Sequence, residues 1–214
     1  MTTTTSTNWL RLLAGLCGMA APVLTLGLIF VAVAISPWFS WQNDALSDLG
    51  VSPAAPVFNT ALIVGGVLNV GLALGVRQWA GPGWLSRLGS GGLLIAAILL
   101  SLIGLITEDH KEPHVAVAAG YFLLTPVSYL VLGTALLRRG VRVPGFLTMA
   151  AGLAALTLIT LTPHHVSRGI AVPEILTALV ISCWSFSVGT LLLVGEKLLT
   201  LPQVGGQVSD RNTS

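Results

Sequence analysis

Long apolar runs separated by short polar segments dominate the chain. Six runs approach or exceed the length of about 20 mostly apolar residues that a helix needs to cross the hydrocarbon core of a bilayer. They are residues 12–35, 57–76, 88–106, 115–137, 144–161 and 175–194. Prolines stand near most of the boundaries, where they cost no intrahelical hydrogen bond. The pattern predicts an all-α protein, a polytopic bundle of six transmembrane helices.

Composition narrows the class of protein further. The chain has 54% hydrophobic and 8% charged residues, whereas a soluble domain carries about 25% charged residues. This excludes an ordinary water-soluble core, global disorder, and nucleic-acid binding as the main role. We expect one transmembrane domain over residues 12–194, with tails at 1–11 and 195–214. The run of threonine and serine in the first tail predicts disorder there.

Charge distribution predicts the orientation. Eight of the ten lysines and arginines fall on one side of the six runs, and only Lys111 and Arg168 fall on the other. Cationic residues accumulate in cytoplasmic loops of membrane proteins. We therefore expect a multi-pass protein of the cell membrane with both termini in the cytoplasm and the loops at 36–56, 107–114 and 162–174 outside.

A weak internal repeat bears on the architecture. Residues 133–137 (GTALL) resemble residues 189–193 (GTLLL) near the cytoplasmic ends of the fourth and sixth runs. A histidine-containing turn follows the third run and another follows the fifth. If this similarity reflects duplication, the bundle consists of three helical hairpins with their turns outside.

The outer loops collect nearly all the chemically reactive side chains, including all four histidines and six of the eight carboxylates. The carboxylates and one hydroxyl that we select as catalytic candidates are Ser47, Asp48, Glu108, Asp109 and Glu174. The candidate metal ligands are His110, His114, His164 and His165. The candidate binding residues are Asn43 and Asn59.

These residue types suit zinc or another divalent cation, because imidazole and carboxylate groups are its usual ligands. A zinc-bound water can attack an ester or amide near neutral pH. A structural explanation competes with this one: a short interfacial amphipathic helix over residues 36–50, a hydrated turn at 107–114, and Glu174 stabilised at a helix start. Fixed catalytic spacings such as H-E-x-x-H and G-x-S-x-G are absent from the sequence. The sequence leaves open whether the protein is an enzyme.

The predicted membrane midplane carries polar residues such as Asn69 and Ser101 but no carboxylate, lysine or histidine. Ion-driven transporters usually place an ionisable side chain there. This argues against ion-coupled transport and leaves a passive pathway open.

The string Trp41-Gln42-Asn43-Asp44-Ala45-Leu46-Ser47-Asp48-Leu49-Gly50, followed by Phe58-Asn59, resembles a prokaryotic six-span family catalogued as domain of unknown function 998. The likeness continues at His114, Glu174 and Trp184. It implies a six-helix membrane fold and no established activity.

A looser likeness connects the chain to the membrane hydrolases that include alkaline ceramidases and adiponectin-type receptors. Those proteins use a serine, an aspartate and three histidines around zinc, and Ser47, Asp48, His110, His114 and His164 supply these residue types. The chain departs from them in its six spans and in the order of these residues.

Three functional hypotheses follow. The first is a structural or lipid-interacting role, with the outer cluster as a polar cap or binding pocket for a lipid. The second is a zinc-dependent hydrolase acting on a lipid or amphiphile at the outer leaflet, and the third is a passive facilitator or channel. Nucleic acid is not expected as a partner, and the sequence does not indicate an oligomeric state.

Overall fold

The computed structural model describes residues 3–160 and 169–194. Its elements, in order, are α1 (Thr3–Ala34), the 3₁₀ helix η1 (Leu46–Val51), α2 (Ala55–Trp79), α3 (Trp84–Leu105), α4 (Lys111–Arg138), α5 (Arg142–Thr160) and α6 (Ala171–Val194). Each of the six α-helices is long and apolar enough to cross a membrane. The prediction of an all-α bundle with six spanning helices is confirmed.

The first helix is longer than its apolar run. It begins at Thr3, so it passes through most of the segment 1–11 in which composition predicts disorder. Adding residues to an existing helix avoids the cost of nucleation, so a polar segment can continue an apolar span. The tail predicted at 195–214 lies outside the described residues.

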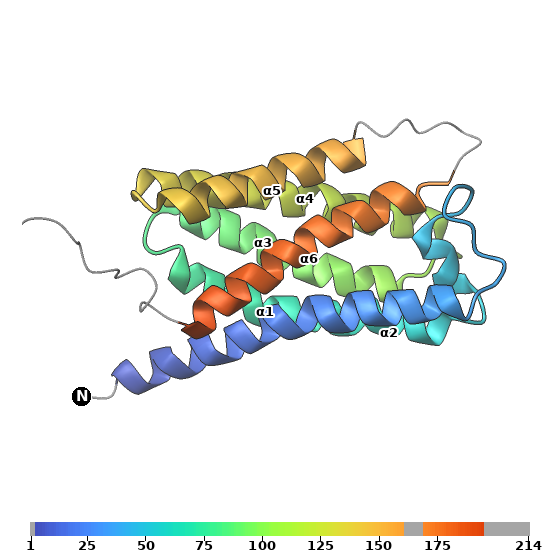
Figure 1. Cartoon of the computed structure of the whole chain (residues 1–214), viewed down its shortest axis with the longest axis horizontal. Helices are drawn as coiled ribbons and strands as arrows, with labels where there is room; N and C mark the ends of the chain where they lie inside the picture. Colours follow the sequence, from blue (N-terminus) through green and yellow to red (C-terminus); the bar gives the residue numbers. More distant parts are fainter. Residues whose placement is uncertain (1–2, 161–168, 195–214) are drawn as a thin grey trace, which may run out of the picture.

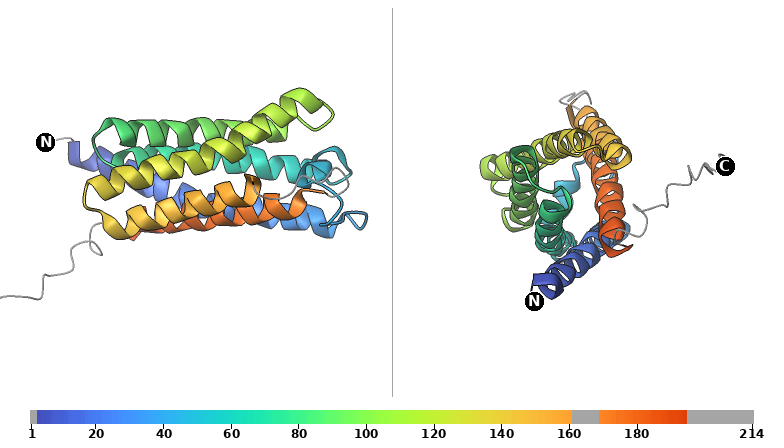
Figure 2. Two further views of the ribbon diagram at one scale, coloured as in Figure 1. Left: turned by 90° about the horizontal axis from the view of Figure 1, so that it is seen from above. Right: turned by 90° about the vertical axis from the view of Figure 1, so that its left-hand side faces the viewer.

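The six α-helices form a ring. Each packs against its neighbours in sequence, and α6 returns to pack against α1. Figure 2 shows this ring end-on, with η1 at one end of its interior. α1 packs on α2 and α3 on α4, as in the hairpins that the repeat suggests, and α2 packs on α3 as extensively as on α1, so that the hairpins join in one ring.

The turns gather at two ends of the ring. η1, the α3–α4 turn and the start of α6 meet at one end, which we call the η1 end (Figure 1). The start of α1 lies at the other end together with the α2–α3 and α4–α5 turns. Arginines satisfy backbone carbonyls there: Arg139 donates to the carbonyl of Ala80 and Arg77 to that of Gly81.

The contact between α1 and α6 changes along its length. Away from the η1 end, Gly15 and Gly18 lie directly against Gly189, where an added Cβ would approach the Gly15 carbonyl oxygen to 2.8 Å. Small residues permit such close approach of membrane helices. Toward the η1 end the two helices diverge (Figure 1), and the space between them becomes part of the candidate site.

Candidate functional site: an acidic cluster above an apolar pocket

η1 covers the end of the ring. Leu46 and Leu49 are buried in the bundle core. The Asp48 carboxylate accepts a hydrogen bond from the backbone N–H of Ala45 at 2.7 Å, which fixes the start of η1. In place of one longer helix over residues 36–50, turns precede η1, and Asp44 closes one of them by accepting from the Ser40 N–H at 2.7 Å.

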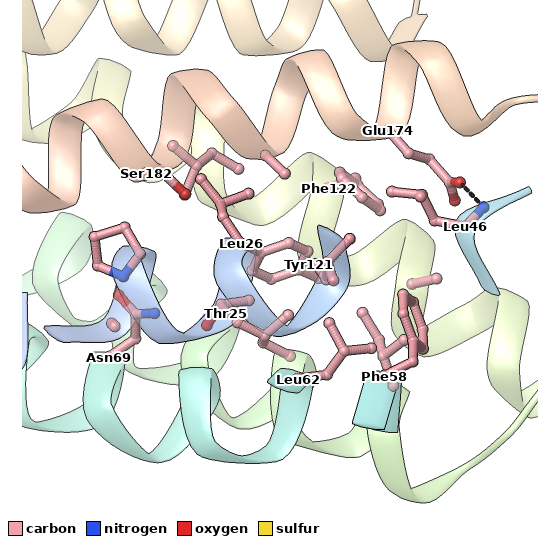
Figure 3. A pocket seen from close by; sticks show the side chains of 18 of the residues that line it. Thr25, Leu26, Leu46, Phe58, Leu62, Asn69, Tyr121, Phe122, Glu174 and Ser182 are labelled. Atoms are coloured by element: carbon pink, nitrogen blue, oxygen red, sulfur yellow. Dashed lines mark hydrogen bonds between the residues drawn. The ribbon is translucent and has the colours of Figure 1, made fainter. Parts of the chain in front are cut away.

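Glu174 connects α6 to η1. Its buried carboxylate accepts a hydrogen bond from the backbone N–H of Leu46 at 2.8 Å, across 128 residues of sequence (Figure 3). Two backbone bonds reinforce the connection: Gly169 donates to Gln42, and Ala171 donates to Asp44 at 3.0 Å. The start of α6 is therefore bonded directly to the segment that precedes η1.

His114 connects α3 to α4. It lies in the first turn of α4 and is only 6% exposed, and its Nδ1 is 2.6 Å from the carbonyl oxygen of Ile106. A carbonyl accepts but cannot donate, so Nδ1 carries the proton. In the neutral ring, Nε2 is then left as the acceptor, able to take a proton or bind an electrophile.

Glu108 lies in the α3–α4 turn, and its Oε2 is buried without a hydrogen-bond partner. Burial is the main cause that raises the pKa of this carboxyl above its usual range. Three neighbours have smaller effects: the Ser47 hydroxyl lowers the pKa of Glu108, the nearby Asp48 carboxylate raises it, and His114 lowers it. These side chains therefore lie close together.

Glu174 belongs to the same group, because it lies within electrostatic range of Glu108 and Asp48. We call Asp48, Glu108 and Glu174 the acidic cluster. None of the three forms an ion pair with a described residue. Clustered carboxylates repel one another unless a proton or a cation is shared among them.

The structure thus brings together five of the predicted site residues, namely Ser47, Asp48, Glu108, His114 and Glu174. Others lie apart from them. Asp109 and His110 are exposed at the turn. Asn43 is exposed and donates to the Ser40 hydroxyl, and Asn59 donates to the Gly50 carbonyl at 3.0 Å and so attaches η1 to α2.

His164 and His165 lie outside the described residues. Within residues 3–160 and 169–194, no group of three or more histidine, cysteine, aspartate or glutamate side chains is arranged to hold a metal ion. The metal site remains a prediction.

A pocket begins beside Ser47, His114 and Glu174 and runs into the bundle between α1 and α6. Its cavity volume is about 80 Å³, and α2, α3 and α4 also contribute to its wall. Leu46 and Glu174 line the η1 end, while Asn69 and Ser182 line the deep end (Figure 3). His114 and Ser185 also line the pocket. The wall between the two ends is largely apolar, and a smaller cavity continues beyond Asn69.

Sequence reasoning missed most of this pocket. Glu174, Ser182 and Ser185 fall on one face of α6 by their helical spacing, so the face could have been recognised as polar. The apolar wall could not be recognised from the sequence, because Leu26 and Phe122 resemble the lipid-facing or core residues of any spanning helix.

The family comparison covers the whole site. The profile of the family "Protein of unknown function (DUF998)" matches residues 19–191. The chain belongs to this family. The matched region of this DUF998 protein includes η1, the acidic cluster and every residue that lines the pocket. No curated protein and no solved structure matches the chain.

Proposed function

We propose that this DUF998 protein is a membrane-embedded binding protein for a cationic amphiphile. The ligand's apolar part occupies the pocket, and its positively charged head lies at the acidic cluster. The excess of lysine and arginine at the opposite side supports placing this cluster at the outer face of the cell membrane.

The apolar part of the proposal rests on the pocket wall. Leu26 and Ile29 from α1, Phe58 and Leu62 from α2, and Phe122 from α4 face a space that no side chain fills. Van der Waals packing, more than the hydrophobic effect, holds membrane helices together. The residues that line an unfilled pocket therefore lack some of the contacts that stabilise the rest of the bundle. An acyl or similar chain would restore them.

The charge of the head group rests on the acidic cluster, which is the observation that carries the proposal. Asp48, Glu108 and Glu174 lie close together, and Glu174 also lines the apolar pocket. His114 acts on Glu108 electrostatically, but no described lysine, arginine or histidine forms an ion pair with the three carboxyl groups. An amine or quaternary ammonium would supply the missing charge. An anionic head group would meet like charge and bind weakly.

Two alternative functions would require other features of the structure. A zinc-dependent hydrolase would use Ser47, Asp48 and the free Nε2 of His114, and it would require metal ligands beyond the described residues. A passive facilitator would use the smaller cavity, which shares Asn69, Tyr121 and Ile181 with the pocket. Metal content of the purified protein and solute flux into proteoliposomes are the corresponding measurements.

Photolabelling tests the proposed function. The protein in phosphatidylcholine nanodiscs is irradiated with a diazirine-bearing long-chain alkylamine or with the carboxylic acid of the same chain. We expect the amine to label pocket residues of α1, α4 or α6, and the acid to label them at least tenfold less.

Matched variants locate the bound amine. Leu26 lines the pocket, whereas Leu24 on the same helix is 45% exposed on the outer surface. Leu26→Trp should abolish labelling by filling the pocket, and Leu24→Trp should leave it unchanged. Glu174→Gln keeps an acceptor for the Leu46 N–H and should weaken labelling by removing charge. Equal labelling by amine and acid, or labelling insensitive to Leu26→Trp, would refute the proposal.

A further inference from the structure

The deep end of the pocket is polar, although it lies near the middle of the spanning helices. Thr25 from α1, Asn69 from α2 and Ser182 from α6 line the pocket there (Figure 3). Ser185 of α6 lines it too, and its hydroxyl lies 3.4 Å from the Asn69 Oδ1. Polar side chains at such depth normally bond across helices or to their own backbone, because unsatisfied groups are costly there. The hydrogen bonds that these side chains form therefore show whether a donor or acceptor remains free to bind a ligand.

The hydroxyl of Ser182 remains free to form a hydrogen bond with a ligand. Several helical serines and threonines donate to the carbonyl four residues earlier, as Ser187 does to Cys183 at 2.7 Å and Thr125 does to Tyr121 at 2.8 Å. The Ser182 hydroxyl forms no hydrogen bond with any described residue. It lines the pocket instead.

Asn69 is also only partly satisfied. Its Nδ2 donates one hydrogen bond to the Gly65 carbonyl at 2.8 Å, and its Oδ1 accepts a long one of 3.4 Å from Ser185. A side-chain amide can donate twice and accept twice. The remaining donor and acceptor belong to a group that lines the pocket wall.

We infer that Asn69 and Ser182 form a second polar subsite, which binds a neutral hydroxyl or carbonyl group of the same amphiphile deep in the membrane. This inference rests on the proposed function and adds the ligand's second polar group. The group is neutral because the carboxyl and imidazole side chains that line the pocket, Glu174 and His114, come from the helix starts at its other end. A charge at the deep end would be desolvated without a partner.

The spacing of the two subsites defines the ligand further. Glu174 and Ser182 are eight residues apart on α6, which corresponds to about 12 Å of helix. The ligand is therefore an amphiphile with a cationic head and a hydrogen-bonding group about 12 Å along its apolar chain.

Competition measurements test this. The diazirine alkylamine is displaced by one of two unlabelled competitors: an α-amino-ω-hydroxyalkane with ends about 12 Å apart, or the plain alkylamine of the same length. The ratio of their half-maximal concentrations is measured for the parent and for each variant. The partitioning of the two amines into the bilayer is the same for the parent and the variants, so it cancels when their ratios are compared.

We expect Ser182→Ala to reduce the relative affinity of the hydroxylated amine about 3- to 10-fold, the effect of losing one hydrogen bond. Affinity for the plain amine should stay unchanged. Asn69→Leu should act in the same direction. Ser187→Ala is the matched control, because it removes a hydroxyl that already bonds to its own helix, and it should change neither affinity.

The outcomes separate the two proposals. If Ser182→Ala and Asn69→Leu leave the ratio at the parental value, the deep subsite is refuted and the amphiphile pocket stands. If neither amine displaces the photolabel from the parent, the cationic-amphiphile function fails, and the subsite fails with it.

Discussion

The same two helices behave differently in the two halves of the bundle. Away from the η1 end, α1 and α6 touch through Gly15, Gly18 and Gly189, with backbone against backbone. Nearby, Trp184 packs on Tyr129 with ring centroids 4.1 Å apart and donates to the Thr148 hydroxyl at 3.1 Å. The α1–α6 contact of this half is closely packed, and the unfilled space there is the smaller cavity beside Tyr129 and Trp184.

In the half near η1, the helices separate around the pocket, and hydrogen bonds replace packing. Glu174 bonds to Leu46, His114 to Ile106, and Asn59 to Gly50. These bonds close the end of the ring while the interior remains unfilled. A polar frame around a cavity allows the helices to remain apart without collapsing onto one another.

The difference indicates a division of roles between a rigid support and a binding region. Close packing fixes the crossing of α1 and α6 at one end, and that crossing sets how far they separate at the other. Ligand sites commonly need this combination of a rigid scaffold and residues held by supporting hydrogen bonds.

The largest expected effect comes from closing the glycine contact. In Gly189→Ala, the new Cβ would lie 2.8 Å from backbone atoms of Gly15, Gly18 and Met19, so the helices must shift. We expect the free energy of unfolding to fall by about 1–3 kcal/mol, measured by denaturation in mixed micelles. Gly27→Ala is the control, because an added Cβ there meets nothing within 4 Å. Equal losses in both variants would contradict the packing role.

A smaller effect is expected from the polar frame. His114→Ala removes the bond to the Ile106 carbonyl and should lower the free energy of unfolding by about 1–2 kcal/mol. His110→Ala, at an exposed position, should change it by less than about 0.5 kcal/mol. His114→Asn places an amide N–H near the position of Nδ1 and should restore part of the loss. If His110→Ala proved the more damaging, the assignment of the frame to His114 would be wrong.

The sequence predicts the scaffold well because spans are encoded locally, by apolar length and flanking prolines. The meeting of Asp48, Glu108 and Glu174 was foreseeable too, since alternating spans bring their three loops to one end. The family likeness includes His114 and not His110, but the residues alone do not show which ring is buried, because one bond to Ile106 decides this. The pocket depends on the separation of α1 and α6, which is set by contacts between residues far apart in the chain, such as Gly15 with Gly189. No local sequence pattern encodes this separation.

The smallest expected effect concerns the charge of the acidic cluster. Burial raises the pKa of Glu108 in the folded protein, so the folded state holds this proton more tightly than the unfolded state does. Stability should therefore fall as pH rises from the ordinary glutamate pKa of about 4.3 toward the raised value. Water at this partly exposed side chain keeps the loss below about 1 kcal/mol.

Glu108→Gln should flatten that part of the pH profile, measured as the melting temperature in nanodiscs between about pH 4 and pH 8. Glu112→Gln, at an exposed position of the same turn, is the control and should leave the profile unchanged. A saturating long-chain alkylamine should also flatten the parental profile, because its positive charge compensates the ionised carboxylate. Parallel profiles for the parent and Glu108→Gln would show that the Glu108 proton is not held by the fold. A parental slope that the amine leaves unchanged would show that the cationic head binds elsewhere.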